Sequence, residues 1–251
     1  MNQDTNITEG QAEWKKWATF VGPLAAYMLL SSLVIAIWER IDIQLVTKES
    51  PSVAMSSVVI RLVSILAIFM WGVSQIKRHF PLQVSFLSVP IGILGAIIWV
   101  GLCRLNLETQ LLSIIGLPAD LLGEREATNP WDLFQSDRTL YLFLTLRLSL
   151  LIIAVPIAEE LFLRGFLLRY LQDPNWDDLP LTSLGPSVIG VSAIYGILTH
   201  PSEWIAAALW FSLVSWLMLR TQRFWDCVVA HGITNGILGA YIIWAQDWRL
   251  W

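Results

Sequence analysis

Residues 158–165 read Ala-Glu-Glu-Leu-Phe-Leu-Arg-Gly and close an almost wholly apolar run that begins at Leu140. If the run is helical, Glu160 and Arg164 lie four residues apart on one face and can form an ion pair. Glu159 is rotated by about 100° from Glu160 and points elsewhere. A carboxylate in a poorly solvated place holds a proton more readily than one in water, which suits a general base at neutral pH. The stretch predicts a membrane-embedded helix that carries a candidate catalytic glutamate.

The rest of the chain has the composition of a membrane protein. Of its 251 residues, 55% are hydrophobic and only 14% are charged, and the mean hydropathy is +0.60. Soluble domains are less apolar, so we expect an all-α, polytopic transmembrane helical bundle of about seven to eight spans, forming a single integral membrane domain over residues 1–251. The net charge of −4 is scattered without a basic stripe, which excludes nucleic-acid binding. Cys103 and Cys227 lie in apolar segments and are expected to be buried thiols.

Seven apolar runs are long enough to be considered as membrane spans. They cover residues 17–38, 53–75, 86–103, 139–171, 186–200, 203–219 and 225–245. Proline predicts bends at Gly22-Pro23 and at Pro156, which neighbouring helices can accommodate. The longest polar loop is 104–138, and apolar residues at helical spacing predict a short amphipathic helix within 107–122.

The charges between the spans predict the orientation of the chain. Lys77-Arg78-His79 is the most basic short loop, which places it in the cytoplasm together with the N-terminus. The 104–138 loop and the C-terminus are then outside. Residues 1–16 lack the apolar core and cleavage site of a signal peptide, so we expect this stretch to be retained. Several tryptophans flank the spans as an interfacial belt. Trp210 and Trp216 instead lie inside a span, where packing or lipid contact is favoured over lining a lipid-substrate groove.

Two histidines lie within or at the end of apolar segments. His200 closes the fifth run, and His231 lies four residues before Asn235, so these two share a helix face in the last run. Glu159-Glu160-x-x-x-Arg164, a later histidine and then His231-x-x-x-Asn235 resemble the CPBP family, which includes CaaX prenyl proteases and bacteriocin-processing (Abi) intramembrane proteins. The resemblance covers a motif-bearing core of about residues 139–245.

One motif departs from the family pattern. The family has Phe-x-x-x-His at its second motif, whereas Gly196 stands four residues before His200 and Tyr195 stands five before it. A simple zig-zag of spans also places His200 at the far end of the fifth run. It can join Glu159 and His231 only if that run is short, tilted or partly re-entrant, which is allowed where backbone lines a cavity.

The resemblance implies an intramembrane endopeptidase that hydrolyses a peptide bond in a membrane-tethered protein. Glu159 would take a proton from the attacking water, and His200 would orient that water. His231 and Asn235 would donate hydrogen bonds to the developing oxyanion. Glu160 and Arg164 would brace the site, although on their own they could be a purely structural ion pair. We expect no cofactor.

Several alternatives stay open at this stage. Two histidines and a glutamate are a possible zinc-ligand set, although the sequence has no His-Glu-x-x-His motif. The chain could also be a non-catalytic immunity or scaffold protein of the same fold. A transporter is less favoured because no inverted repeat is visible. The run 225–231, Trp-Asp-Cys-Val-Val-Ala-His, resembles the branch found beside exosortase-type sorting systems of bacteria, which implies a protein-sorting partner and the plasma (inner) membrane; the prenyl branch would instead imply farnesylated C-terminal peptides.

Overall fold

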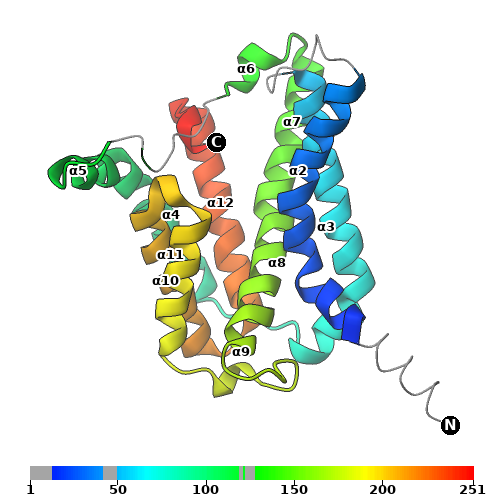
Figure 1. The fold of residues 1–251 in the computed structure, drawn as a ribbon, viewed down its shortest axis with the longest axis vertical. Coiled ribbons are helices and arrows are strands. Elements are labelled where there is room, and N and C mark those ends of the chain that lie inside the picture. Colours follow the sequence, from blue (N-terminus) through cyan, green and yellow to red (C-terminus); the bar gives the residue numbers. More distant parts are fainter. Residues whose placement is uncertain (1–12, 42–49, 119–120, 122–127) are drawn as a thin grey trace. The chain divides into compact units, whose positions relative to one another are not determined.

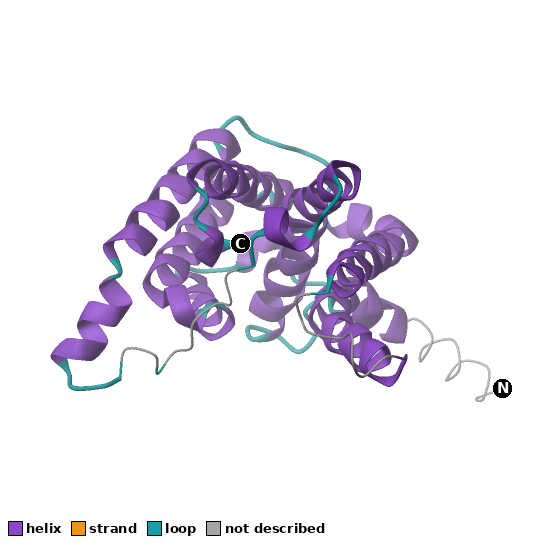
Figure 2. Cartoon of the chain, turned by 90° about the horizontal axis from the view of Figure 1, so that it is seen from above, coloured by secondary structure: helices purple, strands orange, loops and turns teal. Residues whose placement is uncertain are grey.

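The computed structural model describes residues 13–41, 50–118, 121 and 128–251, and within these residues the chain forms helices and no strands (Figure 2). The prediction of an all-α protein is therefore confirmed. Some predictions fall outside the described residues. They concern residues 1–12, residues 42–49 within the loop 39–52, and residues 119–120 and 122–127 within the loop 104–138.

The chain divides into two compact units that alternate along the sequence (Figure 1). The first comprises the described residues up to Leu82 together with Pro130–Leu167, and the second comprises Gln83–Asn129 and Leu168–Trp251. The predicted motif-bearing core, 139–245, thus contributes to both units. That the whole chain acts as one integral membrane domain stays a prediction.

The first unit holds the acidic motif on a long helical segment. Its elements after the helical residues 13–20 are α2 (Gly22–Ile41), α3 (Pro51–His79), α6 (Pro130–Leu133), α7 (Asp137–Ser149), η1 (Leu150–Ala154), α8 (Val155–Glu160) and η2 (Leu161–Leu167). The predicted break at Gly22-Pro23 is observed, because Val21 is a turn and α2 begins at Gly22. Proline lacks the amide hydrogen that a continuous helix would need at this place.

The second unit holds both candidate histidines. Its elements are α4 (Ser88–Leu105), α5 (Leu107–Ile114), α9 (Leu168–Tyr170), η3 (Leu181–Ser183), α10 (Ser187–Thr199), η4 (Pro201–Glu203), α11 (Trp204–Thr221), α12 (Phe224–Ala245) and η5 (Trp248–Leu250). Asn106 (φ 47°) and Gln222 (φ 56°) adopt left-handed backbone, which lets α4 turn into α5 and α11 turn into α12 within one or two residues.

Six helical segments of the described chain are long and apolar enough to cross a membrane. They are Gly22–Arg40, Pro51–His79, Ser88–Leu105, Asp137–Tyr170, Pro201–Thr221 and Phe224–Ala245. The fifth predicted span is an apolar helix as expected, but α10 has only 13 residues. At about 1.5 Å per residue it is about 20 Å long, less than the roughly 30 Å of a bilayer core.

Specific contacts fix the register of the helices in the second unit. Ser85 donates its backbone N–H and its hydroxyl to the two carboxylate oxygens of Asp226, each at 2.6 Å, and thereby joins the chain entering α4 to the first turn of α12. Farther along, Gly92 lies against Ala230. The residue numbers of the contacts increase in the same direction along both helices, so α4 and α12 run parallel.

The α10 helix runs antiparallel to α11. The Ser215 hydroxyl donates to Ser192 at 2.7 Å, and Gly196 of α10 lies against Ala207 of α11. The link that precedes α10 is held by Arg169, whose buried guanidinium donates to the carbonyls of Leu179 at 2.7 Å and Asp177 at 2.8 Å. Backbone carbonyls therefore accept hydrogen bonds from the buried charge of Arg169, to which the sequence interpretation gave no role.

Candidate active site

The adjacent glutamates lie on one turn of α-helix between two π-helical segments. Glu159 and Glu160 end α8, while η1 precedes it and η2 follows it, both with π geometry. Pro156 in the first turn of α8 has no N–H to donate, so the backbone before it departs from the regular i→i−4 pattern. π-Helical turns are rare and often mark functional sites. The predicted irregularity at Pro156 is present, and it immediately precedes the acidic pair.

The predicted ion pair between Glu160 and Arg164 is confirmed. Arg164 Nη1 lies 2.7 Å from Glu160 Oε2, and both side chains are fully buried. Glu159 is also buried, with a relative exposure of 7%. Charged side chains within apolar helices are costly, and their presence is by default a sign of function. This pairing could be predicted because it depends only on local helical spacing.

Gly165 permits a close approach to the helix that carries these charges. A methyl group at Gly165 would lie 2.8 Å from Cδ1 of Phe20, which is itself fully buried. Phe20 also packs edge-on against His79 and Phe80 at ring-centroid distances of 5.6 and 6.2 Å. The prediction of a loop at Lys77-Arg78-His79 is therefore wrong, because these residues form the last turn of α3 and the His79 ring contacts the core of the first unit.

His231 is buried in the second unit against a tryptophan. The ring centroids of His231 and Trp210 are 4.5 Å apart, and His231 is only 4% exposed. Trp210 Nε1 donates to the hydroxyl oxygen of Thr234 at 3.1 Å, and Thr234 Oγ1 lies 2.8 Å from the Gly92 carbonyl oxygen. Asn235 follows on the same helix, one turn after His231, and is half-buried.

Two glycines of α4 bring these groups together. A methyl group at Gly95 would lie 2.7 Å from Trp210 Nε1 and 2.9 Å from Thr234 Oγ1, and one at Gly92 would lie 2.7 Å from the Ala230 carbonyl oxygen. Small residues let membrane helices approach closely. The spacing of Gly92, Gly95 and Ala96 is therefore the sequence signal that could have marked α4 as the partner of the His231 helix.

His200 lies at the end of α10 and is held by neighbours from three elements. Its Nδ1 is 2.9 Å from the Thr199 hydroxyl oxygen, and its backbone N–H donates to the Gly196 carbonyl. Its ring packs edge-on against Trp99 of α4 at 5.3 Å and lies 5.8 Å from Phe211 of α11, both measured between centroids. The imidazole is thus oriented by aromatic groups that the sequence interpretation did not assign to the site.

The departure from the family's Phe-x-x-x-His motif has a steric reason. A methyl group at Gly196 would lie 2.6 Å from Phe211 and 2.9 Å from the Ala207 carbonyl oxygen, so no larger residue fits there without separating α10 from α11. Phe211 instead brings an aromatic ring to His200 from the neighbouring helix. Tyr195 packs edge-on against the Phe211 ring, with centroids 5.2 Å apart.

Two tryptophans that contact each other link the two histidines. Trp99 contacts His200, Trp210 contacts His231, and the two tryptophan rings lie 6.3 Å apart. The α10 helix is short, as one of the conditions for His200 requires, and His200 lies beside Trp99 of α4; that His200 also joins Glu159 stays a prediction. Glu159, Glu160 and Arg164 belong to the first unit, and His200, His231 and Asn235 belong to the second.

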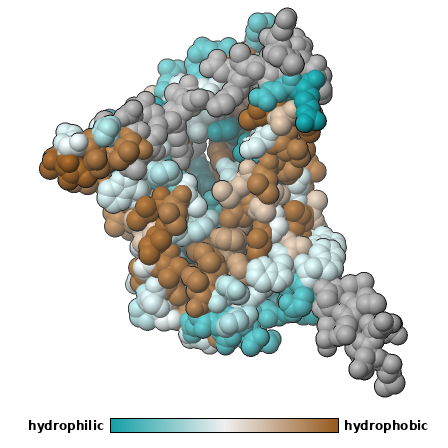
Figure 3. Space-filling view, viewed as in Figure 1, coloured by the Kyte–Doolittle hydropathy of each residue, from teal (hydrophilic) through white to brown (hydrophobic). Residues whose placement is uncertain are grey.

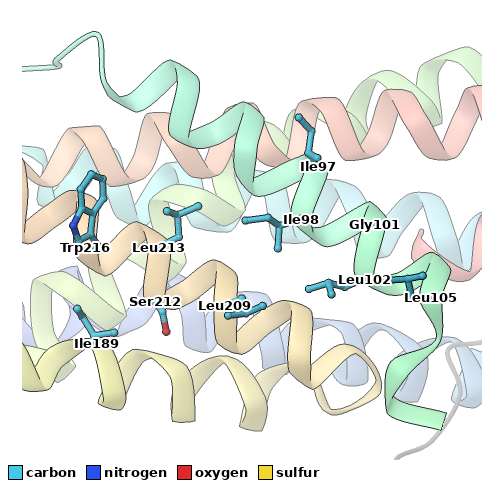
Figure 4. A pocket seen from close by; sticks show the side chains of 10 residues that line it. All are labelled: Ile97, Ile98, Gly101, Leu102, Leu105, Ile189, Leu209, Ser212, Leu213 and Trp216. Atoms are coloured by element: carbon cyan, nitrogen blue, oxygen red, sulfur yellow. The ribbon is translucent and has the colours of Figure 1, made fainter. Parts of the chain in front are cut away.

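The two inner tryptophans have different surroundings. Trp210 is buried among site residues, which agrees with the packing role favoured for it. Trp216 is exposed and lines an apolar groove of about 850 Å³ between α4, α10 and α11 (Figure 4). The groove is also lined by Ile97, Ile98, Gly101, Leu102, Leu105, Ile189, Leu209, Ser212 and Leu213.

The fold and these residues define a class of protein. Apolar helices of spanning length carry buried acids, an arginine and histidines, so the chain is an integral membrane protein with polar site residues inside its helical bundle. No group of three or more His, Cys, Asp or Glu side chains suited to a metal ion occurs among the described residues.

Comparison with known proteins gives a family match for the central part of the chain. Residues 141–237 match the sequence model described as type II CAAX prenyl endopeptidase Rce1-like. This match confirms the resemblance to the CPBP family that the motifs show. The matched segment contains every candidate site residue. No curated protein and no solved structure gives a significant match to the chain.

Proposed function

We propose that the protein is an intramembrane endopeptidase that hydrolyses a peptide bond in a membrane-tethered protein or peptide. The observation that carries the proposal is the position of Glu159, a buried carboxylate next to a fully buried Glu160–Arg164 ion pair, inside the segment that matches a prenyl endopeptidase family. An ion pair alone could be structural. Glu159, the buried acid next to this pair in a segment that matches a protease family, is best explained by a catalytic role.

Glu159 acts as the general base in this proposal. It removes a proton from a water molecule, whose oxygen attacks the scissile carbonyl carbon, and the proton then passes to the leaving amine. Because Arg164 is engaged with Glu160 at 2.7 Å, the two neighbouring carboxylates have different charge environments. Glu160 and Arg164 brace the turn that presents Glu159, which keeps the base in a fixed position.

His200 orients the attacking water. Its Nδ1 contacts the Thr199 hydroxyl, so we assign Nε2 to the water. His231 and Asn235 donate hydrogen bonds to the oxyanion that forms when the carbonyl is attacked, and such donors can contribute several kcal/mol in a site that excludes water. The burial of His231 under Trp210 supports a water-poor environment around this donor.

The proposed partners and location follow from the proposal that the protein is an intramembrane endopeptidase. The substrate is anchored in the bilayer, and a protein-sorting system is a possible partner if the chain belongs to the exosortase-associated branch. The location is the plasma (inner) membrane with a cytoplasmic N-terminus, which the basic residues in the last turn of α3 support. The mechanism uses no cofactor.

Mass-spectrometric comparison of membrane-protein termini tests this function. Cells carry either the wild type or Glu159→Gln at equal abundance in the membrane. We expect a defined new terminus in the wild type and its loss, with accumulation of the uncleaved protein, in the variant. Glu39→Gln is the matched control because Glu39 is an exposed carboxylate of the first unit, and it should retain cleavage.

The same experiment separates the alternatives. A non-catalytic immunity or scaffold protein would give identical termini for the wild type and Glu159→Gln while the phenotype of the gene persists. A zinc-dependent protease would lose cleavage with 1,10-phenanthroline and regain it with added zinc, whereas the proposed mechanism predicts no effect of the chelator on cleavage by purified protein.

A further inference from the structure

The short helix α5 has three distinct faces. Glu108 and Leu112 are buried against the second unit. A second face is apolar and exposed, with relative exposures of 43% for Leu111, 78% for Ile114 and 67% for Ile115. The remaining face is polar, uncharged and exposed, and consists of Thr109, Gln110 and Ser113. On a helix with 3.6 residues per turn, the apolar and polar residues occupy separate arcs.

Two contacts fix the level of α5 relative to the membrane-spanning helices of its unit. Gln110 Nε2 donates to the carbonyl of Leu105, the last residue of α4, at 2.8 Å. The backbone N–H of Ile205, in the first turn of α11, donates to Glu108 at 3.2 Å. The end of one span and the beginning of another therefore meet at α5. Because spans end near the membrane boundary, these contacts place α5 at the level where that boundary is expected.

The direction of α5 differs from that of the span before it. Asn106, with φ 47°, interrupts the helix, and α5 leaves the end of α4 sideways (Figure 1). Hydrophobic atoms gather along α5, at the left of Figure 3, with paler residues above them. A helix that continued along α4 would have to carry its exposed isoleucines into water, whereas one that turns aside at the boundary can keep them in the bilayer.

We propose that α5 is an interfacial helix, which inserts Leu111, Ile114 and Ile115 into the boundary between headgroups and acyl chains while Thr109, Gln110 and Ser113 face the headgroups and water. The occupant of the apolar face is the bilayer itself, because that face is continuous with the lipid-facing surface of α4 through the exposed Leu105. A helix with an apolar arc and a polar arc is suited to this position. The interaction is independent of whether the protein cleaves peptides.

Site-directed spin labelling of the full chain tests this proposal. The protein with a single added cysteine, Leu111→Cys or Ile114→Cys, is labelled and reconstituted in vesicles of phosphatidylethanolamine and phosphatidylglycerol. Thr109→Cys and Ser113→Cys are the matched controls on the polar face of the same helix. Wild-type protein reports background labelling, which should be small because Cys103 and Cys227 are buried.

Collisions with oxygen, which concentrates in lipid, and with a water-soluble nickel chelate give the result. We expect labels at 111 and 114 to have a several-fold higher ratio of oxygen to nickel accessibility than labels at 109 and 113. Equal nickel accessibility on both faces would show that α5 lies in water and would overturn the proposal. Low accessibility to both reagents at 111 and 114 would overturn it too, because it indicates cover by protein. Every substituted position is exposed, so none of the variants removes a core contact.

Discussion

Neighbouring residues of the same type have different surroundings in the acidic motif. Glu160 is held by Arg164 in a fully buried ion pair, whereas Glu159 lies on another side of the helix, where we assign it to water activation. Two buried charges with good geometry can be neutral for stability as a pair, but removing one of them is strongly unfavourable. We therefore expect substitution of Glu160 to lower the stability of the protein and substitution of Glu159 to lower its catalytic activity.

The ion pair gives a prediction at the residue scale. Glu160→Gln should lower the free energy of unfolding by about 3–5 kcal/mol, because it leaves a buried guanidinium beside a neutral amide. The double variant Glu160→Gln with Arg164→Met should lose less than the sum of the two single losses. Thermal unfolding in detergent measures both effects.

Glu159→Gln serves as the comparison for this prediction, since it should reduce cleavage with little change in the unfolding temperature. If the losses from Glu160→Gln and Arg164→Met simply add, the two side chains are energetically independent, and the assignment of Glu160 as a brace through Arg164 is wrong.

At the scale of elements, the contact between α10 and α11 positions His200. The helices approach so closely that Gly196 lies against Phe211 and Ala207, while a buried hydrogen bond joins Ser192 to Ser215. Tight packing of this kind leaves little freedom for the residue that follows the helix. A change that separates α10 from α11 should therefore move the imidazole and reduce activity as well as stability.

Two glycines on α10 provide a matched test of this packing. A methyl group at Gly196 would lie 2.6 Å from Phe211, whereas one at Gly190 would meet no atom within 4 Å. We expect Gly196→Ala to destabilise the protein by about 1–3 kcal/mol through overpacking and to lower cleavage. Gly190→Ala should be neutral or stabilising by up to about 1 kcal/mol because alanine favours helix.

Unfolding midpoints and cleavage rates of the two variants, measured side by side, check this expectation. Equal behaviour of Gly196→Ala and Gly190→Ala would mean that the α10–α11 contact can relax without cost, and the steric explanation for the missing phenylalanine would fail.

Features that depend on local sequence patterns could be predicted, whereas contacts between distant residues could not. The last span was expected at 225–245 and α12 is Phe224–Ala245, and the Glu160–Arg164 pair follows from spacing alone. By contrast, the bond between Ser85 and Asp226 joins residues 141 positions apart. The tryptophans that hold the histidines were also missed, because a buried tryptophan in an apolar run has no periodic signal that distinguishes it from a lipid-facing one.

At the scale of the whole molecule, the parallel arrangement of α4 and α12 determines which side of the membrane the chain ends on. Ser85 and Asp226 bind each other at the starts of both helices, so their C-terminal ends emerge on the same face. The basic residues Lys77 and Arg78 lie in the last turn of α3, the helix before α4, and favour the cytoplasm. If α4 starts in the cytoplasm, Arg249 after α12 lies outside, and α10 must pass most of the bilayer despite its 13 residues.

Labelling of added cysteines with a membrane-impermeant maleimide tests this topology. Leu82→Cys, at an exposed position before α4, should react only after the membrane is permeabilised, whereas Arg249→Cys should react in intact cells. Gln110→Cys, beyond the end of α4, is the internal control and should behave like Arg249→Cys. Reaction of positions 82 and 249 from the same side would contradict the parallel arrangement of α4 and α12.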